Sequence, residues 1–230
     1  MKRALMLIVP VVLVVILIGA LAAALPRESP LEEAAGETGD AVQCANLIYA
    51  GTRSSVCFSD QFLSNLARDS TIQTARKFKP VKLADHEIFR YPFAVMTGEG
   101  GFTLTEAERA NLRRYLERGG FLLASAGCSS AQWNASFRNE MRTIFPDRSL
   151  ETIAMDHEIF RTVHSLNSLK TKGPEAQLAG LSLGGKIVLI YSSDGLNDTS
   201  TMHGCCCCGG NEIENAQQVN ANILAYALLQ

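Results

Sequence analysis

The sequence predicts one α/β domain with a mostly parallel sheet, preceded by a single N-terminal transmembrane helix. Two observations predict this architecture. A long uncharged run opens the chain, and after it short apolar segments alternate with amphipathic ones. Strands and helices that alternate with short connections form βαβ units, which are right-handed and build parallel sheets. A chain of 230 residues is expected to hold one such domain.

The uncharged run covers Ala4–Leu25 and follows Lys2 and Arg3. As a helix it reaches about 33 Å, which is enough to cross the apolar core of a bilayer, about 30 Å thick. Residues 1–25 are therefore expected to anchor the chain in a membrane. The alternative is a cleaved signal peptide, for which Ala22–Ala24 supply a small-residue cleavage site.

Charge predicts the orientation of this segment. Residues 26–41 form an acidic linker that contains one basic residue, Arg27, and five acidic residues. Because basic flanks stay on the cytoplasmic side, we expect the N-terminus inside and the domain of residues 42–230 outside, on the periplasmic side. If the segment is cleaved, the domain is secreted. The membrane is then the one predicted partner, and any protein or small-molecule partner stays open.

The charge of the domain itself bears on nucleic-acid binding. The whole chain carries −2, the first three residues carry +2 and the linker carries −4, so the domain carries 0. Proteins that bind nucleic acids neutralise phosphates with a surplus of lysine and arginine. The sequence therefore predicts no nucleic-acid partner.

The first half of the domain predicts three strands and one helix. Ala45–Ala50 is an apolar strand that Gly51 ends, and residues 80–83 and 93–96 form further short apolar runs. Apolar residues at helical spacing predict a helix over 59–69.

A second helix is marked at both of its ends. Thr105 and Glu108 have the spacing of a capping box, in which each side chain satisfies an orphan amide of the first turn. Gly119 supplies the left-handed residue at which such helices stop.

The second half of the domain continues the alternation. Residues 121–126 and 186–191 are almost wholly apolar, as is typical of strands covered on both faces. Helical spacing of apolar residues predicts helices over 133–144 and around 219–227.

Ligands of doubly wound sheets sit beyond the carboxyl ends of the strands. The turns there contain most of the reactive residues of this chain: Cys57, Glu99, Cys128, His203 and Cys205–Cys208. Cys128 lies between a buried strand and a helix, where a tight turn exposes a nucleophile near amides that stabilise its thiolate. In a catalytic interpretation His203 is the base and Glu99 a general acid or base. The alternative is a small thiol that packs the turn.

The cysteine run has two further interpretations. Cys205 and Cys208 have the C-x₂-C spacing of metal sites, and His203 with Cys57 or Cys128 would complete a tetrahedron around a zinc or iron ion. In an oxidising compartment, disulfides such as Cys44–Cys57, or one from Cys128 to the run, could form instead. Seven cysteines leave at least one without an intrachain partner.

Five segments together resemble the bacterial family named domain of unknown function 4159, over roughly residues 43–230. They are Ala45–Gly51, Tyr91–Gly100, Arg118–Leu122, Ile144–Asp147 and Asp156–Phe160. The family is similar to class I glutamine amidotransferase-like domains of the trehalose-utilisation type. The resemblance implies a flavodoxin-like three-layer sandwich and no assigned activity.

In glutaminases of that superfamily the nucleophilic cysteine sits at the strand–helix elbow, the position that Cys128 matches. The present chain departs from their pattern, because Ser130 replaces the glycine two places after the cysteine and no His-x-Glu pair follows. The sequence thus leads first to a non-enzymatic binding or scaffold module of the cell envelope. The alternatives are a thiol-dependent hydrolase that uses Cys128 and a metal or redox site at the cysteine run.

Overall fold

The computed structural model describes residues 41–51, 58–197 and 210–230. All of them belong to the second of two units of the chain, Thr38–Gln230. The predicted anchor, residues 1–25, lies outside the described residues, as does nearly all of the linker. Among the helices that the structure does describe, none is both long enough and apolar enough to cross a membrane.

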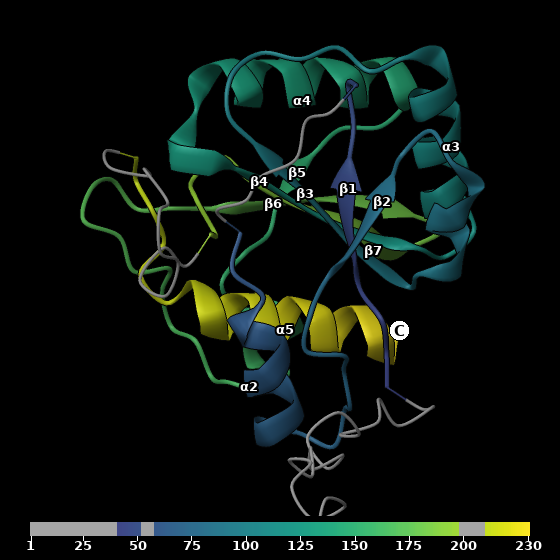
Figure 1. Ribbon diagram of the computed structural model, residues 1–230. Coiled ribbons are helices and arrows are strands. Elements are labelled where there is room, and N and C mark those ends of the chain that lie inside the picture. The colour runs from purple at the N-terminus through teal and green to yellow at the C-terminus, as the bar shows by residue number, and fades with distance from the viewer. Residues whose placement is uncertain (1–40, 52–57, 198–209) are drawn as a thin grey trace, which may run out of the picture. The chain divides into compact units, whose positions relative to one another are not determined.

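The domain is an α/β fold built on a mixed sheet whose strands lie in the order β2-β1-β3-β4-β7-β6-β5 (Figure 1). Five strands are parallel: β1 (Ala45–Ile48), β2 (Lys79–Lys82), β3 (Phe93–Gly98), β4 (Phe121–Ala126) and β7 (Lys186–Ser192). β6 (Leu178–Leu183) runs antiparallel to β7, and β5 (Glu151–Thr152) pairs antiparallel with β6 at the edge of the sheet. The predicted α/β class and mostly parallel sheet are confirmed.

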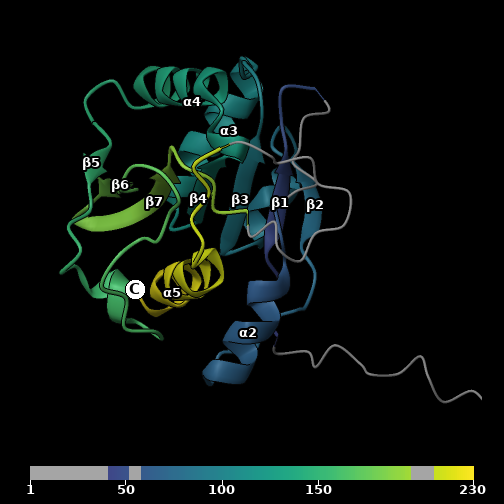
Figure 2. The same cartoon turned by 90° about the vertical axis from the view of Figure 1, so that its left-hand side faces the viewer.

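Helices cover both faces of the sheet, as Figures 1 and 2 show. On one face lie α3 (Glu106–Glu117) and α4 (Ala131–Ile144), and on the other lie α2 (Gln61–Asp69) and α5 (Ala216–Leu229). The described elements also include three short 3₁₀ turns: η1 (His86–Arg90), η2 (Gly127–Ser129) and η3 (Glu158–Arg161). Each face has its own apolar core, because every second residue of a strand points to the same side.

The central strands are buried because both of their faces are covered. Every residue of β4 is buried, and so are all residues of β3 except Gly98. Phe93 pairs with Phe121 across these two strands, and their rings stack with centroids 5.8 Å apart. The almost wholly apolar runs in the sequence thus correspond to the strands at the centre of the sheet.

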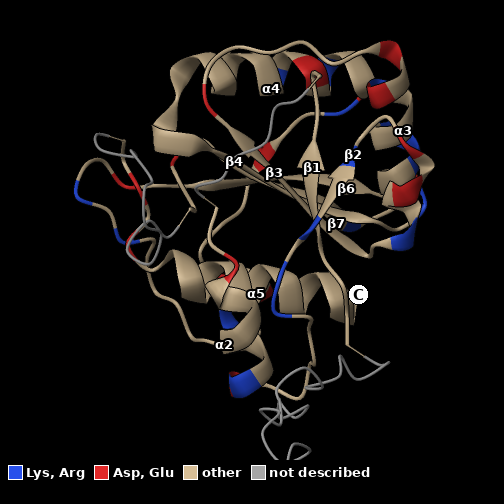
Figure 3. Ribbon diagram, in the orientation of Figure 1, with Lys and Arg blue, Asp and Glu red and all other residues tan. Residues whose placement is uncertain are grey.

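Helix α5 is the most apolar of the described α-helices and carries no charged residue, so Figure 3 shows it without blue or red. Eight of its residues are buried, which places it between the sheet and α2. By contrast, α3 and α4 carry charged residues of both signs (Figure 3).

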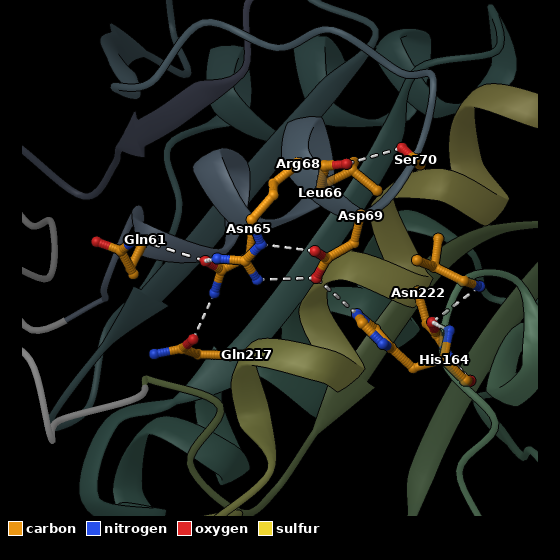
Figure 4. Close-up of polar contacts among 10 residues, drawn as sticks. Gln61, Asn65, Leu66, Arg68, Asp69, Ser70, His164, Gln217 and Asn222 are labelled. Atoms are coloured by element: carbon orange, nitrogen blue, oxygen red, sulfur yellow. Dashed lines mark hydrogen bonds and ion pairs between the residues drawn. The ribbon is translucent and has the colours of Figure 1, made fainter.

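Polar contacts join α2 to α5 and to the loop after η3 (Figure 4). The Asn65 side chain donates a hydrogen bond to Gln217 of α5. Asp69 lies 3.7 Å from the Nε2 atom of His164. The backbone amide of His164 donates to Asn222 at 2.8 Å, and the Asn222 amide group donates back to the His164 carbonyl. These contacts give His164 a structural role.

Helix α3 begins with the predicted capping box. The Thr105 hydroxyl accepts a hydrogen bond from the Glu108 amide, and the Glu108 carboxylate accepts one from the Thr105 amide at 2.7 Å. The other carboxylate oxygen of Glu108 accepts the Ala50 amide at 2.8 Å, so one side chain ties α3 to the end of β1. Gly119 ends the helix with a φ of 91°, as expected of a left-handed stop.

The sheet contains a hairpin that the strand–helix alternation did not reveal. β6 and β7 are joined by Gly184 and Gly185, whose φ angles of 58° and 83° suit a tight two-residue turn. The two outer strands of the sheet are short: β5 has two residues, and β2 has four residues and contains Pro80.

Candidate functional site

The candidate site lies at the edge of the sheet where β1, β3, β4 and β7 have their carboxyl ends. The chain leaves β1 toward β2 on one side and later returns to β3 on the other, so the strand order reverses between β1 and β3. Doubly wound sheets bind their ligands outside such a reversal. Glu99 follows β3 there, and Cys128 follows the neighbouring strand β4.

Cys128 stands on a strained elbow between β4 and α4. Its φ and ψ angles are 51° and 30°, and Ser129 also has a φ of 51°. Left-handed backbone at a residue with a side chain costs about 1–3 kcal/mol and persists only where the surroundings enforce it. Two consecutive residues of this kind mark the elbow as a specially held part of the molecule.

Three consecutive residues, Gly210–Glu212, hold the elbow in place; we call them the elbow clamp. Gly210 packs so tightly that a Cβ atom there would overlap the Cys128 carbonyl. The Asn211 amide donates to the Ser129 hydroxyl at 2.7 Å, and a Glu212 carboxylate oxygen accepts the Cys128 amide at 3.0 Å. The clamp thus binds the Cys128 amide and the Ser129 hydroxyl of the strained turn, although it lies far from them in the sequence.

Glu99 lies on the other side of the cysteine. Its carboxylate oxygen is 3.4 Å from the Cys128 sulfur, so the structure brings together these two predicted site residues. The Ser130 hydroxyl accepts the Gly100 amide at 3.1 Å and joins the turn after β3 to the start of α4. A carboxylate beside a thiol disfavours its ionisation, whereas an activated cysteine needs a cationic neighbour. The catalytic roles of Cys128 and Glu99 stay predictions.

Glu212 is an acid at this edge whose pKa is raised. Burial raises the pKa of its carboxyl group, and the charges of Asp194 and Glu99 add to the rise, while the amides of Cys128 and Asn197 oppose it. Its second oxygen is buried and has no hydrogen-bond partner among the described residues. The Glu212 carboxyl group packs directly against Gly195, and a Cβ atom at that position would overlap it. Perturbed carboxyl groups of this kind concentrate at functional sites.

Buried polar side chains line the sheet beneath the edge. The Tyr49 hydroxyl donates to the Thr97 carbonyl at 3.0 Å, and the Ser125 hydroxyl accepts the Leu196 amide at 2.9 Å. The Asn197 side chain is fully buried, yet within the described residues its Nδ2 group donates no hydrogen bond. The residues beneath the site are therefore polar and buried, and the Asn197 Nδ2 group can still donate hydrogen bonds.

The remaining predicted site residues, His203, Cys205, Cys208 and Cys57, lie outside the described residues. Hence a zinc or iron ion at the cysteine run stays a prediction. The residues that flank this run, Asn197 and Gly210, both lie at the elbow. In the ranges that the structure does describe, no three His, Cys, Asp or Glu side chains are grouped so that they could hold a metal ion.

Cys44 corrects one sequence-based alternative. It is a free thiol whose side chain is fully buried, so the suggested Cys44–Cys57 disulfide is not formed. Burial raises the pKa of Cys44 to about 12, which leaves the thiol protonated and unreactive at neutral pH. Cys44 belongs to the core on the α2 and α5 face.

Sequence reasoning missed the elbow clamp entirely. Gly210–Glu212 resemble an ordinary loop before a helix, and no spacing rule links them to Cys128, more than 80 residues earlier. The one available signal was their position after the last parallel strand, which returns the chain to the same edge of the sheet.

Replacing Glu212 with glutamine is expected to stabilise the domain at neutral pH. Because the folded pKa is raised, the native state holds more protons than the unfolded state just above the ordinary pKa of 4.5, so stability falls as pH rises through that window. Glutamine removes the buried charge and keeps an oxygen for the Cys128 amide. The variant should melt at a higher temperature than the unchanged protein at pH 7, and the difference should vanish below pH 4.5, where the native carboxyl group is protonated.

Thermal melts between pH 4 and pH 8 measure this effect. Glu214→Gln is the matched control, since Glu214 is exposed two residues further on. Equal melting temperatures of the Glu212→Gln variant and the unchanged protein at pH 7 would contradict the interpretation that burial destabilises the charged Glu212 carboxylate.

Comparison with known proteins agrees with the resemblance to domain of unknown function 4159. A search of curated proteins finds no match. A family model described as a domain of unknown function, DUF4159, matches residues 44–228, a stretch that includes every described strand, the elbow and the elbow clamp. The chain therefore belongs to the DUF4159 family.

Proposed function

We propose that this protein is a membrane-tethered binding module of the cell envelope, with its ligand site at the edge around Cys128, Glu99 and Glu212. The N-terminal run of apolar residues supports the tether, and the Lys2–Arg3 flank supports an extracytoplasmic domain. The order of the parallel strands, 2-1-3-4-7, supports the flavodoxin-like part of the resemblance to glutamine amidotransferase-like domains.

The observation that carries the binding proposal is the state of Glu212. A carboxyl oxygen that is buried without a hydrogen-bond donor costs about 1–3 kcal/mol. Asp194 and Glu99 add negative potential at the same place. A ligand with an amine, guanidinium or amide N–H group would satisfy the oxygen and offset the charge. We therefore expect the ligand to be cationic or rich in N–H donors.

A thiol-dependent hydrolase is the second candidate, and the left-handed elbow at Cys128 favours it. Nucleophiles of α/β hydrolases occupy strained strand-to-helix turns of this kind. In that case His203 would act as base, and amides of residues 98–101 would form the oxyanion site. The Glu99 carboxylate lies 3.4 Å from the sulfur and disfavours ionisation of the thiol. We therefore prefer the binding module to the hydrolase.

The binding proposal is tested with agmatine, a small guanidinium-bearing amine, added to the full chain in a neutral detergent. We expect agmatine to raise the melting temperature of the unchanged protein and to have no such effect on the Glu99→Gln/Glu212→Gln variant. The Glu106→Gln/Glu117→Gln variant removes the same charge from the exposed surface of α3 and should respond like the unchanged protein.

Two outcomes would overturn the proposal. One is an equal response of all three proteins to agmatine. The other is turnover of a small ester or amide that Cys128→Ala abolishes, which would establish the hydrolase instead. The tether is tested separately: after alkaline extraction the full chain should stay in the membrane fraction, and protease added to spheroplasts should digest its domain.

A further inference from the structure

A hollow lies away from the carboxyl edge, beside the C-terminal half of α4. It has a volume of about 300 Å³, at the lower end of the range for small-molecule sites. Three arginines surround it, one pair on α4 and one in the following loop: Arg138, Arg142 and Arg148. Its apolar wall comes from α4, the segment before β5 and strand β6: Met141, Leu150 and Leu181. We call it the arginine cleft.

The positive charge of the arginine cleft is uncompensated within the described part of the chain. None of its three guanidinium groups forms an ion pair there, and no acidic side chain lines the hollow. The neighbouring acids in the sequence, Asp147 and Glu151, are exposed and outside the lining. Like charges four residues apart on a helix, as Arg138 and Arg142 are, destabilise it slightly. An anion bound between them would reverse that cost.

An aromatic ring fixes the position of the Arg138 side chain before any ligand binds. Its guanidinium carbon lies 4.8 Å from the centre of the Tyr191 ring, within the range of a cation–π interaction. Tyr191 is itself fixed, because its ring stacks on Phe137 at 4.9 Å and its hydroxyl donates to Asn134. Placing one arginine in advance lowers the entropy that a ligand must remove on binding.

The apolar part of the lining belongs to the packed core. Met141 and Leu181 are 4% and 1% exposed and belong to the core on the α4 face. Leu150 packs against the same core at the rim. A ligand that fills this hollow therefore meets both guanidinium groups and hydrocarbon.

We propose that the arginine cleft binds a phosphate ester, with the phosphate between Arg138, Arg142 and Arg148 and the apolar part of the ester on the hydrocarbon wall. Guanidinium groups present their N–H donors in a planar fork that matches phosphate oxygens, and such bonds are stronger than those between neutral groups. The ester has two sources, a phospholipid headgroup, which is a diester, and a soluble phosphate monoester.

The test uses the full chain in a neutral detergent, with two soluble probes followed by isothermal titration calorimetry. Phenyl phosphate represents the monoester and glycerophosphoglycerol the lipid headgroup. We expect at least one probe to bind, with tighter binding of phenyl phosphate than of inorganic phosphate because of the apolar wall. The Arg138→Gln/Arg148→Gln variant should bind at least tenfold more weakly.

The matched control is Arg114→Gln/Arg118→Gln, which removes two exposed arginines that lie over the Phe89 ring and line no part of the cleft. This variant should bind like the unchanged protein, and thermal melts establish that both variants are folded. Preferential binding of the diester assigns the site to a lipid headgroup, and preferential binding of the monoester to a soluble ester. Absence of binding by both probes, or equal weakening in the two variants, would overturn the proposal.

Discussion

The Trp133→Ala variant is expected to lose about 3–5 kcal/mol of unfolding free energy, the usual cost of deleting a large aromatic side chain from a core. Trp133 is fully buried. Its ring stacks on Phe137 with centroids 5.0 Å apart and packs against Phe102 at 5.6 Å. Its Nε1 group donates to the Tyr49 hydroxyl at 2.7 Å, so the deletion also removes a buried hydrogen bond beneath the site.

Denaturant unfolding of three variants separates the contributions. Trp133→Phe keeps an aromatic ring and loses the hydrogen bond, so its loss should be clearly smaller than that of Trp133→Ala. Gln132→Ala changes an exposed neighbour on α4 and should stay within about 0.5 kcal/mol of the unchanged protein. If Trp133→Ala costs no more than Gln132→Ala, the core described for the α4 face is wrong.

The Glu108→Ala variant is expected to lose about 2–4 kcal/mol. Its side chain is 4% exposed and accepts hydrogen bonds from the amides of Thr105 and Ala50. A helix cap contributes about 1 kcal/mol, and a hydrogen bond to a charged group about 1.5–3 kcal/mol. Removing the carboxylate also leaves the Ala50 amide without its acceptor, at a residue whose φ is 47°.

Matched variants in the same helix turn test this assignment. Glu106 is exposed in the first turn of α3, so Glu106→Ala should cost at most about 0.5 kcal/mol. Glu108→Gln keeps one good acceptor and should fall between the two. Equal losses for Glu106→Ala and Glu108→Ala in denaturant unfolding would show that the buried contacts contribute nothing.

The elements that the sequence predicted well are those with a strong local cause. The runs at 93–96, 121–126 and 186–191 are almost wholly apolar, and each lies in a strand whose residues are mostly buried. The Thr105–Glu108 spacing placed the start of α3 correctly because a capping box needs only neighbouring residues. Such signals do not depend on where the rest of the chain lies.

The parts that escaped prediction depend on distant segments. β6 is a strand with mixed burial, and its antiparallel pairing with β7 follows from the Gly184–Gly185 turn, which strand–helix alternation does not predict. At the site, strand direction alone placed Glu99 and Cys128 on one edge, and their contact agrees. Glu212 could not be found this way, since only the folded chain brings it to the Cys128 amide.

The two ends of the sheet bear on how copies of the protein behave at high concentration. On one side β2 carries Pro80 between Lys79 and Lys82, and on the other β5 is two residues long. Proline, lysine and extreme shortness are the devices by which natural sheets discourage strand addition by another molecule. Molecules crowded together should therefore resist fibre formation through their sheets, and any ordered assembly must use the helical faces.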